Sequence, residues 1–186
     1  NTALQFRNCK LHTGNKKLRS SSYRKERSMI GVMPSRRDQI RMSEEEQAQF
    51  IGEQKSLQVA TINRDGTPHL STLWFDVVDG DIVFETFTKS QKIKNLERDP
   101  RISCLLEDGL VYEELRGIQI NGTAELYSDP KTVHFYARGV MKRNNPGIPE
   151  EMLDAAAESM STKRTAVVIK AQRVATWDHT KLDVAY

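Results

Sequence analysis

Residues 82–108 read IVFETFTKSQKIKNLERDPRISCLLED, and they join two apolar strands through a short basic helix. The β-branched and aromatic run at 81–87 predicts one strand, and RISCLLED at 101–108 predicts the next. Between them a helix is expected to begin at Ser90 and to end at Asp99, before Pro100. Lys89, Lys92 and Lys94 crowd the start of that helix, where the helix dipole disfavours cations. This unit, a strand that turns through a basic corner into a helix, organises the interpretation of the chain.

The sequence on either side continues the strand pattern. Further strands are predicted at LQVATIN (57–63), PHLSTLWFDVV (68–78), GIQINGTAELY (117–127) and TAVVIKAQRVATWDH (165–179). Hairpin turns are predicted at RDGT (64–67) and DGD (79–81). Helices are predicted from a Ser43–Glu46 capping box, from Pro130 to Arg143, and over MLDAAAESM (152–160). Six strands in hairpin order, with short helices between them, predict a mainly β fold with flanking helices, built on a six-stranded antiparallel barrel.

Charge is distributed unevenly along the 186 residues, although the net formal charge is only +3. Residues 1–37 hold ten Lys and Arg and one acidic residue, whereas the remainder holds 18 basic and 24 acidic residues. The stretch 1–34 is therefore interpreted as a disordered basic tail, and residues 35–186 as one folded domain. Three explanations of the tail stay open: a transit peptide, a nucleic-acid-binding arm, or upstream sequence, with Met33 and Met42 as candidate natural starts.

Several functional classes find no support. No apolar stretch approaches the length of a membrane span, so no membrane partner is expected. Two cysteines, Cys9 and Cys104, suggest no disulfide framework, which favours a cytoplasmic setting, and no Cys/His spacing resembles a metal site. No nucleophile elbow, phosphate-binding loop, dinucleotide fingerprint or pair of catalytic carboxylates is present. Basic and aromatic residues are not interleaved, so nucleic-acid binding by the folded part is not expected.

The basic corner has two readings. If Ser90 caps the helix, its hydroxyl and the free amides of Gln91 and Lys92 face one spot, which suits an anion. The alternative is a solvated corner in which Lys94 pairs with Glu97 one turn later. Other polar or aromatic candidates are weaker on their own, because such residues are often structural: Ser71, Thr72, Trp74, Glu85, Thr86 and Trp177.

Four segments together carry a family resemblance: ATINRDGTPHLSTLWF (60–75), residues 82–108, ELRGIQINGTAEL (114–126) and RVATWDHTKL (173–182). They resemble the split β-barrel flavin and deazaflavin oxidoreductases of the pyridoxamine 5′-phosphate oxidase-like superfamily. The resemblance runs in continuous order from residue 35 to the C-terminus. It implies a six-stranded FMN-binding split barrel over 35–186, which is the cofactor-binding domain, and a homodimer with the cofactor site at the subunit interface.

The resemblance also assigns residues. Those expected to line the isoalloxazine or deazaflavin ring are Leu70, Ser71, Thr72, Leu73 and Trp74, with Trp177 brought near by the last strand. Those expected to hold the ribityl phosphate are Glu85, Thr86, Ser90, Gln91 and Lys92. Lys89 and Lys94 are added as candidates for a longer anionic tail. The second protomer is expected to contribute Arg116 and Gly117.

Departures from the family pattern narrow the expected function. True pyridoxamine-phosphate oxidases carry basic residues where this chain has Leu70 and Phe75, and they end in an Arg-Leu-His-Asp-Arg run where this chain reads WDHTKLDVAY (177–186). The Ser-Gln-Lys corner, Glu-Leu-Arg-Gly strand start and Trp-Asp-His-x-Lys ending look closer to the branch that uses coenzyme F420, a deazaflavin.

The implied reaction is hydride transfer between F420 and a small conjugated substrate such as an enone or a quinone. Catalytic residues are unassigned, since Tyr112, Glu113 and solvent are equal candidates for a proton donor. Two alternatives stay open. One is an FMN-binding oxidoreductase of the same fold, and the other is a non-catalytic module that binds a flavin, a deazaflavin or haem.

Overall fold

The computed structural model describes residues 35–182, so the predictions for the tail at 1–34 and for the last four residues lie outside the described residues. The strands are β1 (Ser56–Ile62), β2 (Pro68–Trp74), β3 (Asp76–Val78), β4 (Asp81–Phe87), β5 (Arg101–Asp108), β6 (Arg116–Tyr127) and β7 (Arg164–Asp178). The α-helices are α1 (Arg36–Gln39), α2 (Glu44–Glu53), α3 (Gln91–Arg98), α4 (Pro130–Asn144) and α5 (Glu150–Ser161), and two short 3-10 helices are η1 (Tyr112–Glu114) and η2 (His179–Lys181). The predicted helices and the two predicted hairpin turns, between β1 and β2 and between β3 and β4, are confirmed, and the four-residue α1 is an addition.

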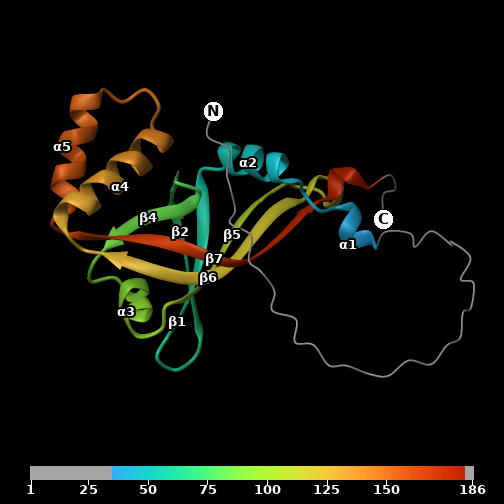
Figure 1. The fold of residues 1–186 in the computed structure, drawn as a ribbon, viewed down its shortest axis with the longest axis horizontal. Coiled ribbons are helices and arrows are strands. Elements are labelled where there is room, and N and C mark those ends of the chain that lie inside the picture. The colour runs from blue at the N-terminus through green and yellow to red at the C-terminus, as the bar shows by residue number, and fades with distance from the viewer. Residues whose placement is uncertain (1–34, 183–186) are drawn as a thin grey trace, which may run out of the picture.

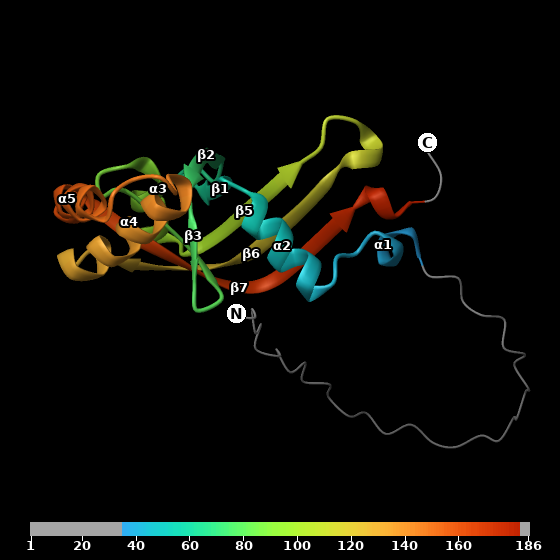
Figure 2. The same cartoon turned by 90° about the horizontal axis from the view of Figure 1, so that it is seen from above.

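The strands form one curled antiparallel sheet, a half-barrel in the order β2-β1-β5-β6-β7-β4-β3 (Figures 1 and 2). It has seven strands, so the prediction of six was wrong. The stretch 68–78, predicted as one strand, breaks at Phe75 into β2, which pairs with β1, and β3, which pairs with β4. These two strands are opposite ends of the sheet order, although one residue separates them in sequence. The sheet must therefore curl until its two edges meet at Phe75.

Beyond Phe75 the two edges stay unpaired with each other. Among the described pairings, β2 bonds only to β1, and residues 84–87 of β4 bond only to β7. Yet β2 and β4 are in contact. We call the line between these two free edges the seam. It is the place where the barrel is split, and its backbone N–H and C=O groups are available to a ligand.

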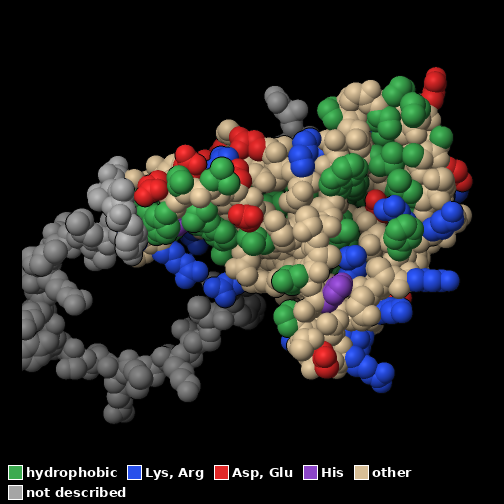
Figure 3. All heavy atoms as spheres, turned by 180° about the vertical axis from the view of Figure 1, so that it is seen from behind, with side chains coloured by type: hydrophobic (Ala, Val, Ile, Leu, Met, Phe, Trp, Pro, Cys, Tyr) green, Lys and Arg blue, Asp and Glu red, His purple; other side chains and the backbone are tan. Residues whose placement is uncertain are grey.

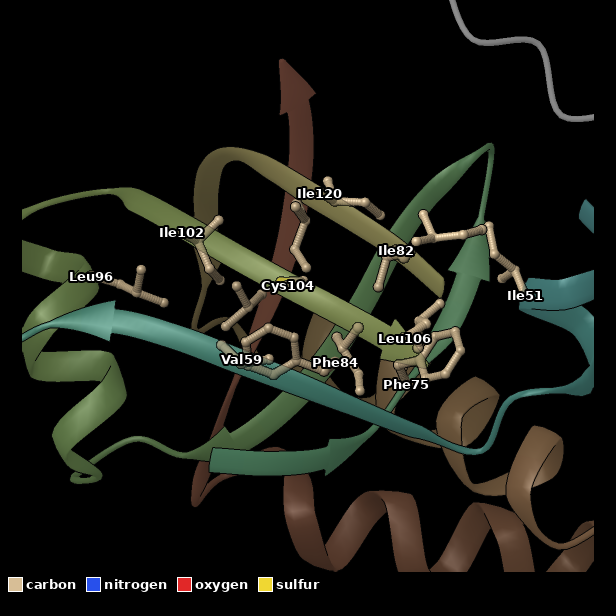
Figure 4. Close-up of a cluster of buried hydrophobic side chains, with 14 of the residues drawn as sticks. Ile51, Val59, Phe75, Ile82, Phe84, Leu96, Ile102, Cys104, Leu106 and Ile120 are labelled. Carbon is tan, nitrogen blue, oxygen red and sulfur yellow. The ribbon is translucent and has the colours of Figure 1, made fainter. Parts of the chain in front are cut away.

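The core fills the inside of the curl (Figure 4). Alternation along β1 turns Leu57 and Val59 inward and leaves Gln58 and Ala60 on the other face. The largest fully buried side chains include Phe50 of α2, Phe75 and Phe84, so the core joins helix α2 to both edges of the sheet.

Helices cover the ends of the sheet rather than its whole surface (Figure 1). The Ser43–Glu46 capping box of α2 is confirmed, with Ser43 N donating to Glu46 Oε2 over 2.6 Å. Helices α4 and α5 pack together, and Arg138 of α4 donates to Asp154 of α5 over 2.6 Å. Within residues 35–182 no helix has both the length and the apolar composition that crossing a membrane requires.

Cys104 of β5 belongs to the core, and burial raises the pKa of its thiol to about 12. We therefore expect a Cys9→Ser variant, which keeps Cys104 as its one thiol, to resist alkylation at pH 8 while folded, because the reactive form is the thiolate. Counting alkylated protein by mass spectrometry, with and without denaturant, tests this. Rapid modification without denaturant would show that Cys104 is accessible.

Candidate functional site

The face of the sheet turned away from the core carries an open pocket of about 680 Å³. It crosses β2, β1, β5, β6 and β7, and its lining includes Gln58, Ala60, Leu70, Ser71, Thr72, Leu105, Gln119 and Trp177. We call it the outer pocket. Its surface is mainly apolar, with neutral amides and hydroxyls between the apolar side chains, as is common for sites that bind planar organic molecules.

Trp177 owes its position in the outer pocket to a glycine. Gly117 of β6 pairs with Trp177 of β7, and a Cβ atom at Gly117 would lie 2.1 Å from Cζ2 of the indole. The tryptophan ring therefore lies against bare backbone. The neighbouring Arg116 is held by residues of the same chain, because it donates to Asp108 over 2.8 Å and to Glu53 over 3.2 Å.

A second, smaller hollow of about 340 Å³ adjoins the outer pocket at Thr72, which lines both. We call it the polar recess, and its lining is Ser56, Thr72, Leu73, Trp74, Glu85 and Arg164. Trp74 ends β2 and Glu85 lies on the free edge of β4, so the recess opens on the seam. Glu85 and Arg164 form an ion pair, with Nη1 and Oε2 2.5 Å apart.

The basic corner, residues 88–94, follows the end of β4. Ser90 is the N-cap residue of α3, but its side chain makes no capping hydrogen bond. Lys92 is half-buried, and Lys92 Nζ donates to Thr86 Oγ1 over 3.3 Å. Desolvation by burial lowers the pKa of Lys92. An anion placed there would restore the electrostatic stabilisation that burial removes from the ammonium group.

The other corner residues differ in their surroundings. Gln91 Nε2 donates to Asn95 Oδ1 over 2.9 Å, so this side chain turns along its own helix. The side chains of Lys89 and Lys94 are exposed and make no ion pair or hydrogen bond with another described residue, so the alternative pair of Lys94 with Glu97 is not formed. Lys and Arg side chains gather over α3 and the adjacent end of the sheet (Figure 3).

Three buried polar atoms near these hollows lack a hydrogen-bond partner: Gln58 Oε1, Ser71 Oγ and Ser90 Oγ. The first two belong to residues that line the outer pocket, and the third is at the basic corner. An unsatisfied buried polar atom costs about 1–3 kcal/mol, so native proteins retain few of them. Two further atoms of this kind, Arg143 Nε and Asn144 Oδ1, lie on α4, so the three near the hollows are candidate ligand contacts and not by themselves a sign of a ligand.

Comparison with known proteins places the chain. A family model described as pyridoxamine 5′-phosphate oxidase matches residues 43–178. The chain belongs to this family. No curated protein sequence matches it. Membership establishes the fold, but not a cofactor or a substrate.

Solved structures extend the family likeness. The conserved hypothetical protein Rv2991 from Mycobacterium tuberculosis is 42% identical, with a TM-score of 0.75, over 81% of this chain and 93% of that one. An F420 reductase is 22% identical, with a TM-score of 0.55, over 68% of this chain and 94% of that one. HutZ, a heme storage protein from Vibrio cholerae, is 15% identical, with a TM-score of 0.55, over 71% and 93%. The last two likenesses show the fold alone.

The residues that the family resemblance assigns fall into three neighbouring groups. Leu70, Ser71, Thr72 and Trp177 line the outer pocket. Leu73, Trp74 and Glu85 line the polar recess with Thr72. Thr86, Ser90 and Lys92 belong to the basic corner. Gln91 and Arg116 are engaged by Asn95 and by Asp108 with Glu53, and their cofactor roles stay predictions.

Sequence reasoning missed Gln58, Leu105, Gln119 and Arg164, all of which line the hollows. The signal for the first three was strand alternation, because Gln58 pairs with Thr72 and Leu105 with both Gln58 and Gln119. Arg164 gave no local signal. It is found through its pairing with Phe87 across β4 and β7, which join distant parts of the sequence.

Replacing Gly117 with alanine is expected to displace Trp177, because the new Cβ would overlap the indole. We expect a shift in tryptophan fluorescence and a loss of about 1–3 kcal/mol of unfolding free energy, the usual cost of overpacking. Gly52→Ala is the matched control, since a Cβ there meets nothing within 4 Å and the helical site favours alanine. Equal behaviour of the two variants would contradict the packing of Trp177 on Gly117.

Proposed function

We propose that the protein is an oxidoreductase that binds the deazaflavin coenzyme F420 and exchanges a hydride with a small conjugated molecule such as an enone or a quinone. The observation that carries the proposal is the apolar outer pocket beside a basic corner, with unsatisfied buried polar atoms at both. An elongated cofactor with a flat ring at one end and a phosphate further along has this distribution of chemistry.

The residues present fit such a cofactor. Leu70, Leu105 and Trp177 give the ring apolar contact, and the free atoms of Gln58 and Ser71 are available for its polar edge. The ring supplies the hydride chemistry when bound, while these side chains orient it and exclude water. At the other end, Lys92 and Ser90, with the free amides at the start of α3, suit the phosphate.

Vitamin B6 oxidation is not favoured for this member of the family. Phe75 stands where true pyridoxamine-phosphate oxidases carry a basic residue, and its side chain is fully buried in the core, at 0% exposure. An arginine or lysine there would lose its hydration, so the position offers no phosphate contact. The substrate is therefore expected to be a different small molecule.

The choice of F420 over FMN rests on charge at the corner. Lys89 and Lys94 are exposed and unpaired among the described residues, so they are available to an anionic tail that extends beyond the phosphate. One structural neighbour of the same fold is named an F420 reductase. FMN, which has no such tail, is the alternative cofactor for the same site.

Haem is the other candidate, since one neighbour of this fold is named a heme storage protein. Haem iron is commonly held by His, Cys, Met or Tyr. The described lining of the outer pocket has no His, Met or Tyr, and its Cys104 is buried in the core with a raised thiol pKa. The lining therefore favours a flavin-type ring.

We also propose that a second copy of the chain covers the outer pocket. Leu70 is 70% exposed and Trp74 is 50% exposed, and both lie on β2 beside the two hollows. Large apolar side chains in that position gain most if a partner surface covers them. Light scattering during size exclusion should give twice the chain mass, and the mass of a single chain would contradict the proposal.

Titration of the purified protein with F420, FMN and haemin, each followed by its absorption or fluorescence, tests the cofactor. We expect saturable binding of F420, and weaker binding of FMN. Mixing the reduced complex with an enone or a quinone should then oxidise the cofactor faster than in free solution. Binding of haemin with no binding of either ring cofactor would overturn the proposal, and binding without oxidation by any acceptor would favour a carrier.

A further inference from the structure

The polar recess contains a charged pair that neither phosphate binding nor ring stacking requires. We propose that Glu85 and Arg164 together recognise the imide edge of the cofactor ring, in which an N–H is flanked by two carbonyl groups. The inference rests on the proposed function and deepens it. It assigns a recognition role to Arg164, a residue with no counterpart among the sequence predictions, and it moves Glu85 from the phosphate, where the family resemblance placed it, to the ring.

The pair is held in place by the sheet. Glu85 lies on β4 and Arg164 begins β7, and the two strands are hydrogen-bonded, with Phe87 opposite Arg164. The guanidinium group also lies over the Phe87 ring, 4.7 Å from its centroid. The Glu85 side chain is only 8% exposed and that of Arg164 24%. Both groups are therefore positioned before a ligand arrives.

The contact within the pair leaves hydrogen-bonding capacity unused. It joins Oε2 of Glu85 to Nη1 of Arg164, and no other hydrogen bond of either side chain is formed with the described residues. Oε1 of the carboxylate remains as an acceptor, and the other guanidinium N–H groups remain as donors. An acceptor and donors thus lie side by side at the wall of the recess.

An imide edge is complementary to that arrangement. Its N–H donates to a carboxylate oxygen, while a neighbouring carbonyl accepts from a guanidinium group, and both contacts are charge-assisted. A phosphate is a poorer ligand here, because the Glu85 carboxylate would repel it. The chemistry of the recess therefore differs from that of the basic corner, where Lys92 is the charged group that faces Thr86.

The polar recess also lies where the edge of a ring bound in the outer pocket would reach it. Thr72 lines both hollows, so a flat ring in the outer pocket that extends past Thr72 brings one edge to Glu85 and Arg164. Flavin and deazaflavin rings both carry the imide edge, whereas haem does not. The pair therefore selects for the class of ring rather than between F420 and FMN.

The test uses two ring compounds without phosphate: lumiflavin, and 3-methyllumiflavin, whose imide N–H is replaced by a methyl group. Quenching of ligand fluorescence gives both dissociation constants for the unmodified protein. We expect the methyl compound to bind about 10-fold more weakly or worse, because one charge-assisted hydrogen bond is lost. Equal affinities would overturn the role of the pair while leaving the proposed function intact.

A double variant, Glu85→Leu with Arg164→Leu, removes both charges and leaves neither one buried alone. We expect the two ligands to bind it equally. The matched control, Arg138→Leu with Asp154→Leu, removes an Arg–carboxylate pair outside the lining of both hollows and should keep the preference; Glu150, which also pairs with Arg138, keeps Lys142 as a partner. If the Glu85 and Arg164 double variant does not fold, the affinities of the two ligands for the unmodified protein still test the proposal. If FMN and F420 also fail to bind the unmodified protein, the proposed function is wrong, and this inference is wrong with it.

Discussion

Replacing Phe75 with alanine is expected to lower the free energy of unfolding by about 3–5 kcal/mol, the usual cost of truncating a buried phenylalanine. The side chain is 0% exposed, and it lies at the single residue that separates β2 from β3. It also meets the Arg143 guanidinium, 4.6 Å from its ring centroid, which links the closure of the sheet to α4. Denaturation by urea, followed by circular dichroism, measures the loss.

Phe135→Ala is the matched control, because Phe135 lies on α4 and is 58% exposed. Surface substitutions usually change stability by no more than about 0.5 kcal/mol. Similar losses in the two variants would contradict the role of Phe75 in closing the sheet. A loss confined to Phe75→Ala would support it.

Replacing Lys92 with alanine is expected to weaken FMN or F420 binding by about 10–100-fold. A hydrogen bond between an ammonium group and a phosphate contributes about 1.5–3 kcal/mol, which corresponds to that range of affinity. Lys92 is half-buried against Thr86, so in the variant water is a poor substitute for the ammonium group as a partner of the phosphate. Fluorescence titration of the variant and the unmodified protein measures the change.

Riboflavin provides the internal control for Lys92, because it carries the ring and the ribityl chain without the phosphate. We expect Lys92→Ala to leave riboflavin affinity nearly unchanged. Lys131→Ala, at an exposed lysine in the first turn of α4, controls for a general loss of positive charge. An equal loss of affinity for FMN and riboflavin would contradict the phosphate assignment, because it would show that Lys92 acts on the ring or the ribityl chain.

Much of the secondary structure could be predicted from local patterns. β4 and β5 lie where runs of β-prone residues predicted them, and α2 begins at the Ser43–Glu46 capping box. These predictions depend on residues within a few positions of one another. The break at Phe75 could not be predicted in this way. No Gly or Pro interrupts the run between Leu70 and Val78, and its division follows from closing the sheet on itself.

The candidate site also combines residues that the sequence indicates with one that only the tertiary structure reveals. Family motifs located Leu70, Thr72 and Lys92, because the motifs are contiguous in sequence. Arg164 was missed because nothing beside it in sequence indicates a site. Its partner, Glu85, is brought to it by the pairing of β4 with β7.

By itself, then, the sequence determined the helices, all strands but the break at Phe75, the two tight hairpins, the uneven charge along the chain, and the family resemblance. These depend on periodicity, capping and turn chemistry, which act over a few residues. Only the tertiary structure decided that β2 and β3 lie at opposite edges of a seven-stranded sheet, and that Glu85 meets Arg164. The reason is that burying one shared core requires the sheet to curl, and curling brings together residues that are far apart in the chain.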